Sequence, residues 1–295
     1  MEPAIVLLGM FDGLHLGHQK LIERAVQIKT HTGWRIILYS FKQNPKKLIA
    51  GLPQQQLMPV FNKIDFAQSL GVDQVILEDF NNSFRNQSAE EFIQKIVNLG
   101  AKTVIVGQDY RFGRNREGTA YALLEYGKKA GFETEIIPPY QIDGMTVSSS
   151  KIREFLLEGK MKEAARFLGR HFSISGVVIA GKHLGGKMGF KTLNIKYDPD
   201  IIQIPFGVYA TRMDNITFSG SHFLKSISNV GVAPTFGGTV PLIETHVFEL
   251  NRDVYGNLVK VKFYEFLRPE RQFESKQELI QTVQHDIETV KKMQY

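Results

Sequence analysis

Two histidines in a glycine-rich segment stand where an apolar run gives way to a helical pattern. His15 and His18 are three residues apart, so both side chains can reach one ligand. Their segment, GMFDGLHLGHQK at residues 9–20, also carries three glycines spaced four apart, which allow a tight backbone path close to a bound molecule. A helix that begins here offers unpaired N–H groups and a positive dipole end to a phosphate. The segment therefore predicts a phosphate-binding site, whereas the plain alternative is a glycine-rich turn with two surface histidines.

Two further segments carry polar side chains that suit the same ligand. VGQDYRFGR, residues 106–114, follows an apolar run and adds an aspartate and two arginines. SSSKIR, residues 148–153, places a serine where it can cap a helix whose first turn displays Arg153. A guanidinium suits the outer phosphates of a triphosphate, although a plain helix cap explains this segment equally well when it is taken alone. Three such segments at sheet-end loops of one domain predict a nucleotide crevice.

A third glycine-rich segment, GKHLGGKMGFKTLN at residues 181–194, begins like a phosphate loop. Gly181 to Lys187 fit the pattern G-x-x-x-x-G-K, but Met188 stands where Ser or Thr would hold Mg²⁺. The residues that follow have no helical pattern, and the segment lies in the half of the chain that is rich in strand patterns. The sequence therefore argues against an ordinary phosphate loop here.

The elements that position these segments change in character along the chain. The first half alternates apolar runs with helical patterns, which favours a doubly wound parallel sheet whose ligands bind beyond the carboxyl ends of its strands. The predicted strands are Ala4–Leu8, Ile36–Phe41, Val75–Leu77, Thr103–Val106 and Thr134–Ile137, and the predicted helices are 17–31, 59–70, 88–98, 118–130, 149–157 and 161–168. Ser88 and Glu91 form the pattern of a capping box.

Short strand patterns separated by turn residues fill the second half, which indicates an antiparallel sheet or small barrel. The predicted strands are Phe172–Ile179, Gly207–Met213, Phe223–Asn229, Thr245–Leu250 and Val259–Phe266. A last helix is predicted from Ser275, with Glu278 completing a second capping box, to Met293. We place the domain boundary near residue 170, which gives domains at 1–170 and 171–295.

Composition narrows the class of protein. With 295 residues, of which 43% are apolar, the chain can form two cores, and its net charge of +6 attracts phosphates. The basic residues are scattered, which favours small phosphorylated substrates over nucleic acid. The absence of cysteine excludes disulfides and thiolate metal sites and fits a reducing cytoplasm. The first residues lack the basic start of a signal peptide, and their apolar run is too short to span a membrane. We therefore expect a cytoplasmic protein with no nucleic-acid or membrane partner.

The motifs G-x-F-D-G-x-H-x-G-H, G-x-D-Y-R-F-G and S-S-S-x-I-R, in this order, resemble the prokaryotic riboflavin kinase/FAD synthetase family. The resemblance extends through SAEEF (88–92), LGR (168–170), NVGVAPTF (229–236) and FLRPE (266–270). It implies an α/β plus β protein. Its N-terminal part would be a Rossmann-like nucleotidyltransferase domain with a parallel sheet. Its C-terminal part would be a riboflavin-kinase-like antiparallel β-barrel that ends in a helix.

For the N-terminal domain the resemblance implies that FMN and ATP give FAD and pyrophosphate. His15 and His18 would stabilise the α-phosphate during attack by the FMN phosphate, Arg153 would hold the departing pyrophosphate, and Mg²⁺ would accompany ATP. The residues that it implies for ATP binding are Gly9, Phe11, Asp12, Gly17, Gly107, Asp109, Ser149 and Arg153.

For the C-terminal domain the resemblance implies phosphorylation of riboflavin by ATP. Thr192 and Asn194 would hold Mg²⁺, and Glu244 would take the proton from the ribityl 5′-hydroxyl, although its sequence context alone favours a solvated strand-end carboxylate. Further nucleotide or flavin positions are Gly181, Lys187, Gly189, Asn229 and Arg268. Gly181 to Lys187 then become the glycine-rich flap of a barrel kinase.

Two departures from the family pattern leave alternatives open. FKQNP at 41–45 keeps the Phe and the final Pro of F-D-P-H-P but lacks its acid and histidine, and Lys191 and Leu193 replace Pro and Ala of G-F-P-T-A-N. The leading interpretation is an enzyme with both activities and with riboflavin, FMN and ATP as substrates. The alternative is an FMN adenylyltransferase with a weakened kinase-like domain. Another nucleotidyltransferase, or a basic flavin-responsive regulator, fits the intact motifs less well.

Overall fold

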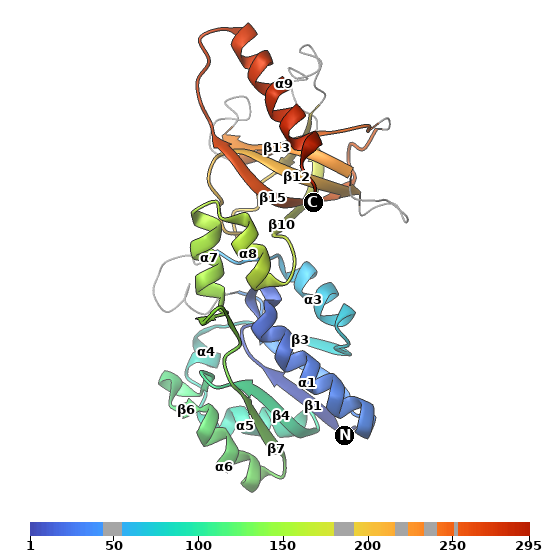
Figure 1. The fold of residues 1–295 in the computed structure, drawn as a ribbon. Helices are drawn as coiled ribbons and strands as arrows, with labels where there is room; N and C mark the ends of the chain where they lie inside the picture. Colours follow the sequence, from blue (N-terminus) through green and yellow to red (C-terminus); the bar gives the residue numbers. More distant parts are fainter. Residues whose placement is uncertain (44–54, 180–191, 216–223, 233–240, 251–252) are drawn as a thin grey trace. The chain divides into compact units, whose positions relative to one another are not determined.

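The computed structural model describes residues 1–43, 55–179, 192–215, 224–232, 241–250 and 253–295 (Figure 1). The chain divides into two compact units, residues 1–151 and 152–295. The division falls within helix α7 (Ser149–Leu157), and helix α8 (Met161–Leu168) lies in the second unit. No helix among the described residues is long and apolar enough to cross a membrane.

The first unit is built on the predicted parallel sheet. Its five strands lie in the order β3-β2-β1-β4-β7, and every described pairing between them is parallel. The strands are β1 (Ala4–Leu8), β2 (Arg35–Phe41), β3 (Gln74–Glu78), β4 (Ala101–Gly107) and β7 (Glu133–Ile137). The chain winds outward from β1 in one direction through β2 and β3, and in the other through β4 and β7. The carboxyl ends of β1 and β4 therefore meet at the switch point, where ligands of such sheets bind.

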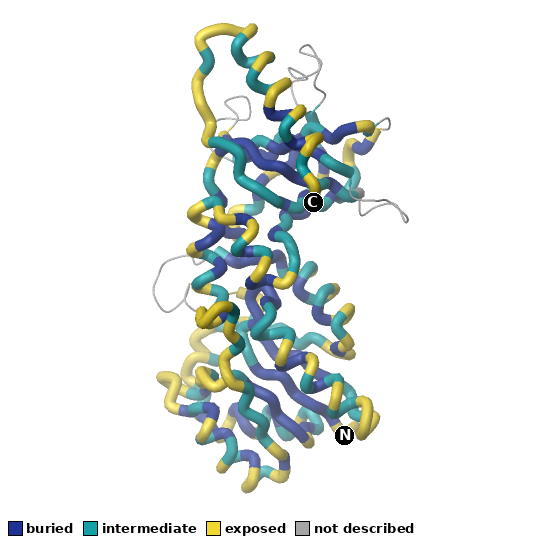
Figure 2. The backbone as a smooth tube through the Cα atoms, viewed as in Figure 1, coloured by how far each residue is buried: buried dark blue, intermediate teal, exposed yellow. Residues whose placement is uncertain are grey.

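Helices cover both faces of this sheet (Figures 1 and 2). They are α1 (Leu16–Thr32), α3 (Val60–Ser69), α4 (Asn82–Arg85), α5 (Ala89–Asn98) and α6 (Ala120–Ala130). Alternate residues of β1 face opposite sides: Ile5 and Leu7 pack with α1 and α3, whereas Val6 and Leu8 pack with α5 and α6. The predicted capping box of α5 is confirmed, since Ser88 and Glu91 exchange both hydrogen bonds.

Short elements complete the first unit. Two 3₁₀ turns, η1 (Asp12–Leu14) and η2 (Arg114–Arg116), follow β1 and β5, and two small hairpins pair β5 (Arg111–Phe112) with β6 (Gly118–Thr119) and β8 (Gln141–Ile142) with β9 (Met145–Thr146). The sequence patterns do not predict these pieces, because they are too short to show a period.

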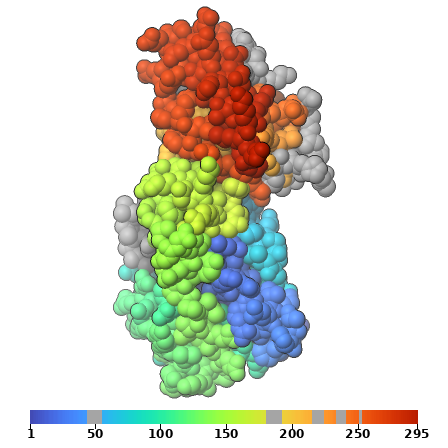
Figure 3. Space-filling model, in the orientation of Figure 1, coloured from blue at the N-terminus to red at the C-terminus, as the bar shows by residue number. Residues whose placement is uncertain are grey.

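The second unit is a closed antiparallel barrel with the strand order β10-β11-β14-β13-β12-β15. The strands are β10 (Ser173–Ile179), β11 (Leu193–Lys196), β12 (Gly207–Asn215), β13 (Leu224–Val232), β14 (Pro241–Val247) and β15 (Leu258–Pro269). The terminal helix α9 (Lys276–Lys292) packs Ile287 and Val290 against apolar residues on the outer face of the barrel. Its side chains lie at the surface of the second unit in Figure 3, in the darkest red.

The barrel corrects three details of the prediction. β11 was not predicted, and β14 spans Pro241–Val247 rather than Thr245–Leu250, because its pairing with β13 ends at Val247. The second capping box is incomplete: the Ser275 hydroxyl accepts from the Glu278 N–H, but the Glu278 carboxylate accepts from the N–H of Glu274 instead of Ser275. β11 was missed because it is short, and the bounds of β14 differ because they are set by its pairing with another strand.

Candidate active sites

The loop after β1 has a strained backbone at the predicted phosphate site. Phe11 and Leu14 have φ of 47° and 40°, in the left-handed region that bulky residues rarely adopt. Gly13 has φ of 76°, which costs glycine little. The Phe11 ring is fully buried beneath Gly9, where an added Cβ would lie 3.0 Å from the ring. The backbone path of this loop therefore depends on Gly9 and Gly13 and on the residues that pack around it.

The two histidines of the loop lie against each other. His15 is the N-cap of α1, and its Nδ1 accepts a hydrogen bond from the His18 backbone N–H at 3.4 Å. Their rings stack with centroids 3.6 Å apart and an interplanar angle of 17°. Gly17 leaves room for this arrangement, since a Cβ there would lie 3.2 Å from the His15 ring. Because Nδ1 acts as the acceptor, the proton of a neutral His15 ring is on Nε2, which makes Nε2 a donor.

Ser149 of the third motif is connected to this loop. Its hydroxyl donates to the carbonyl oxygen of Asp12 at 3.0 Å. The Asp12 side chain is buried, and its Oδ1 accepts from the backbone N–H of Leu57 at 2.9 Å. Asp12 therefore fixes the loop from within the protein. Arg153 lies on α7 in the second unit, so its predicted contact with pyrophosphate stays a prediction.

The second motif forms a tight turn at the carboxyl end of β4. The Tyr110 N–H donates to the Gly107 carbonyl at 3.0 Å, and a Cβ on Gly107 would lie 3.2 Å from Oδ1 of the exposed Asp109. Arg111 is also exposed, whereas the Arg114 Nε donates to the Asn86 carbonyl at 3.2 Å. Gly107 and Asp109 thus lie at the carboxyl end of β4, the strand beside β1, and their predicted contact with ATP stays a prediction.

A cleft of about 530 Å³ lies at the carboxyl end of β3. It is lined by Glu78, Asp79, Asn81, Ser83, Phe84, Asn86, Gln87, Glu91 and Lys95. The rings of Phe41, Phe80 and Phe84 lie 5.1–5.7 Å apart beside it. Sequence reasoning missed this aromatic cluster, whose signal is the four-residue spacing of Phe80 and Phe84. In the FKQNP segment, Lys42 pairs with Asp79 at 2.8 Å, and residues 44 and 45 lie outside the described residues.

Strand register aligns three of the predicted kinase residues. Asn194 on β11 is the direct partner of Glu244 on β14, and Glu244 is the direct partner of Asn229 on β13. Directly paired residues point to the same face of an antiparallel sheet, so the three side chains form one row. Asn194 is 6% exposed. We name these three residues the amide–carboxylate row.

Glu270 is a carboxylate beside this row that sequence reasoning did not assign. Asn229 Nδ2 donates to Glu270 Oε1 at 2.9 Å, and a Cβ on Gly231 would overlap the Glu270 carboxylate. Burial raises the pKa of Glu244, and the negative charge of Glu270 raises it further. The signal for Glu270 was its place in FLRPE. Glu244 is therefore a stronger base than an exposed glutamate.

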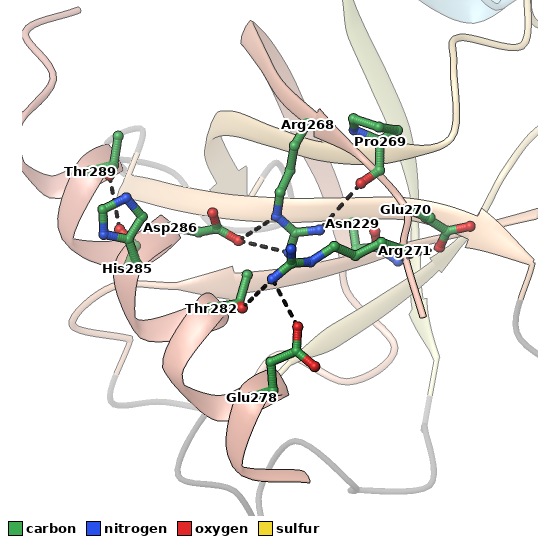
Figure 4. A network of polar contacts seen from close by, with 10 residues as sticks. All are labelled: Asn229, Arg268, Pro269, Glu270, Arg271, Glu278, Thr282, His285, Asp286 and Thr289. Carbon is green, nitrogen blue, oxygen red and sulfur yellow. Dashed lines mark hydrogen bonds and ion pairs between the residues drawn. The ribbon is translucent and has the colours of Figure 1, made fainter. Parts of the chain in front are cut away.

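Arg268 contacts the terminal helix (Figure 4). Its Nε and Nη2 donate to Asp286 Oδ2 at 2.9 and 2.8 Å, and its Nη1 donates to the Pro269 carbonyl. Arg271 makes a neighbouring contact with α9, through Thr282 and Glu278. In the structure Arg268 thus fastens α9 to β15, and its predicted contact with nucleotide or flavin stays a prediction.

The glycine-rich segment before β11 lies mostly outside the described residues. Gly181, Lys187, Gly189 and Lys191 fall in this part, whereas Thr192 directly precedes β11. Asn194 is paired with Glu244, and Thr192 lies two residues before Asn194. Both side chains carry a neutral oxygen atom, and such donors suit a hard cation such as Mg²⁺. Among the described residues, no group of three His, Asp or Glu could by itself hold a metal ion.

A doubly wound sheet with a histidine pair at its switch point, followed by a closed barrel with an amide–carboxylate row, defines a two-domain class of nucleotide-using transferases. Family models support this description: the FAD synthetase model matches residues 1–151, and the riboflavin kinase model matches residues 168–294. The chain belongs to the bifunctional riboflavin kinase/FMN adenylyltransferase family. The two matches leave 152–167 unassigned, so the boundary that we predict at residue 170 stays a prediction.

Similar proteins cover nearly the whole chain. Bifunctional riboflavin kinase/FMN adenylyltransferases from Buchnera aphidicola subsp. Schizaphis graminum and Haemophilus influenzae are 36% and 32% identical to it. The matches span 97% and 99% of this chain and 93% and 94% of those proteins. A crystal structure titled as a macrolide-efflux protein from Streptococcus pneumoniae is 28% identical, with a TM-score of 0.88 over 99% of this chain and 95% of that one. The two chains share the same fold over nearly their whole length.

Proposed function

We propose that this protein phosphorylates riboflavin to FMN with ATP and then adenylylates FMN with a second ATP, which gives FAD and pyrophosphate. The observation that carries the proposal is the stacked histidine pair at the switch point, in a chain whose second unit aligns Glu244 with two amides. Membership of the bifunctional family supports both activities.

In adenylyl transfer, an oxygen of the FMN phosphate forms a bond to the α-phosphorus of ATP while the bond to the departing pyrophosphate breaks. His15 offers Nε2–H to the α-phosphate oxygens, and His18, stacked against it, adds a second donor. We assign Gly107, Asp109 and Ser149 to positioning of the nucleotide and Arg153 to the pyrophosphate. The aromatic cluster of Phe41, Phe80 and Phe84 supplies faces on which an isoalloxazine ring can stack.

In the kinase reaction, the ribityl 5′-hydroxyl oxygen forms a bond to the γ-phosphorus of ATP while the bond from that phosphorus to the departing ADP breaks, and Glu244 takes the proton of the hydroxyl. Its raised pKa strengthens it as a base. Thr192 and Asn194 would hold Mg²⁺, which neutralises phosphate charge when it is bound. We assign Gly181, Lys187 and Gly189 to the nucleotide, and Asn229 and Arg268 to the surroundings of the substrates.

The proposed partners are therefore the small molecules ATP, FMN and riboflavin. We place the protein in the cytoplasm, where ATP and FMN are found. The chain has no cysteine, so it has no disulfide that would need an oxidising compartment. The alternative is an FMN adenylyltransferase whose kinase domain is weakened by Lys191 and Leu193. The observation that favours this alternative is that these two residues replace the Pro and Ala of the family pattern.

One experiment separates the two functions. Purified protein is incubated with ATP and Mg²⁺, in one tube with riboflavin and in another with FMN, and the flavins are resolved chromatographically. We expect FMN and FAD from the riboflavin tube and FAD from the FMN tube. FAD from the FMN tube alone would support the alternative, and no product in either tube would contradict both.

A further inference from the structure

Lys63 on α3 is a fully buried lysine beside the loop that follows β1. Its exposed fraction is 0%, and among the described residues no other lysine or arginine is classed as buried. Its Nζ lies 3.3 Å from the carbonyl oxygen of Met10 and 3.3 Å from that of Phe41. Lys63 therefore joins three elements: the helix that carries it, the end of β2 and the loop after β1.

The Met10 carbonyl is held from two sides. The hydroxyl of the buried Ser40, on β2, also donates to it at 2.8 Å. One backbone oxygen at the start of the loop thus accepts from both Ser40 and Lys63, which uses both of its lone pairs. Such a carbonyl has little freedom to rotate, and its peptide plane sets the direction in which Phe11 leaves the strand.

The strain of the loop explains why such a restraint is needed. Left-handed backbone at a non-glycine residue costs about 1–3 kcal/mol and persists only where the surroundings impose it. Phe11 and Leu14 both have this conformation, directly before the histidine pair. The contacts that impose it at the described residues include those of Met10 with Ser40 and Lys63, together with the Ser149 contact to the Asp12 carbonyl.

The residue type itself argues for a role beyond packing. An ammonium group is costly to bury, and lysine is rarely fully buried unless it has partners. Burial lowers the pKa of Lys63, while the nearby carboxylate of Asp12 raises it. A leucine or methionine would fill the same space without this cost. The role of Lys63 therefore depends on its positive charge and its N–H donors and not only on its size.

We propose that Lys63 is a positioning residue of the adenylyl-transfer site. Its ammonium group holds the carbonyls of Met10 and Phe41 and so fixes the strained loop that presents His15 and His18 to the α-phosphate. Lys63 acts through this loop and does not touch the substrates. The inference rests on the proposed FMN adenylylation.

The test is a Lys63→Met variant, which keeps the length of the side chain and removes its donors. We expect kcat for FAD formation from FMN to fall by about 10–10²-fold, because a displacement of about 1 Å at reacting groups has effects of this size. The KM for ATP should change much less, because the loss is confined to the alignment of the transition state. FMN formation from riboflavin should be unchanged and so serves as an internal control on the same chain.

Lys128→Met is the matched control, since it removes one lysine charge from the exposed side of α6 in the same unit. It should leave both activities unchanged. Ser40→Ala removes the other donor to the Met10 carbonyl and should lower the same kcat. The effect of the double variant should be less than the product of the two single effects, because both residues act on one atom.

The outcomes are distinct. Lys63→Met with wild-type kcat and only a lower melting temperature would show a packing role and overturn the inference. If that variant does not fold, Ser40→Ala decides: a lowered kcat with little change in KM supports the restraint on Met10, and unchanged kinetics contradicts it. A wild-type chain that makes no FAD from FMN would instead contradict the proposed function itself, and this is measured first.

Discussion

The two units place their candidate site residues by different physical means. In the first unit the histidines lie on a strained loop whose shape depends on side chains from β2, α3 and α7. In the barrel, Asn194, Glu244 and Asn229 are aligned by the pairing of the strands that carry them. A site on a loop can therefore be disturbed through its supports, whereas a site on paired strands is disturbed mainly through its own side chains.

A chain of buried hydroxyls reinforces the register of the barrel. Thr211 contacts Ser226 and Ser228, and Ser228 contacts Thr245, at 2.8–2.9 Å. All four side chains have 0% exposure. Ser228 and Thr245 are the chain neighbours of Asn229 and Glu244. A shift of one strand by one residue would turn each of its side chains to the opposite face of the barrel. The hydrogen bonds between these hydroxyls therefore favour the register that puts the amide–carboxylate row on the outer face.

The largest expected effect tests the row directly. Glu244→Gln keeps the shape of the side chain but removes the base, so we expect FMN formation from riboflavin to fall by about 10²–10⁴-fold. FAD formation from FMN should not change. Chromatography of the flavins measures both rates, and a variant that keeps a third of the kinase rate would contradict the role of Glu244.

The matching test in the first unit is His18→Ala. Loss of one donor to a developing negative charge should lower FAD formation by about 10²–10³-fold and leave FMN formation unchanged. His31→Ala is the control, because His31 lies exposed in the last turn of the same helix. Near-normal FAD formation by the His18 variant would remove it from the catalytic assignment.

A smaller effect concerns pH. Glu244 acts as a base only when it is deprotonated, and burial and the charge of Glu270 raise its pKa above the usual 4.5. The kinase rate should therefore fall as the pH drops through that raised pKa, at a pH above 4.5. Glu270→Gln removes one cause of the shift, so the acid limb of the rate profile should move to lower pH. If the acid limb of this variant stays at the wild-type pH, burial alone sets the basicity of Glu244. Glu274→Gln is the control variant, because Glu274 is an exposed glutamate.

The smallest expected effect concerns the support of the barrel by α9. The Arg268–Asp286 pair has side-chain exposures of 21% and 10%, so Asp286→Asn should destabilise the second unit by about 1–3 kcal/mol. Lys162→Gln, which breaks the more exposed pair with Glu265, should cost under about 1 kcal/mol. Thermal unfolding measures both changes. Equal shifts for the two variants would mean that Arg268 does not fasten α9.

Much of the fold could be predicted from sequence because its signals are local. The five parallel strands and the capped helix at 89–98 follow from apolar runs and the capping box of Ser88. The histidine pair could be found because its spacing and its place after a strand coincide. The short strand β11 was missed because four residues after a glycine-rich segment show no period.

The supports of the sites could not be predicted, because they join residues that are far apart in sequence. Nothing near Lys63 indicates that its ammonium reaches Met10, which is 53 positions away. The pairing of Asn229 with Glu270 spans 41 positions, and Arg268 turns to Asp286 only because α9 folds back onto the barrel. Such contacts depend on the tertiary fold and leave no pattern in a single sequence.

The double duty of His15 changes how its variants must be read. Because its ring is also the N-cap of α1, His15→Ala removes a helix cap together with the imidazole, and the two losses appear in one rate. Asparagine is a good N-cap residue but has no ring to stack on His18. His15→Asn therefore keeps the helix start while it deletes the imidazole, and the difference between the Ala and Asn variants separates architecture from chemistry at this one position.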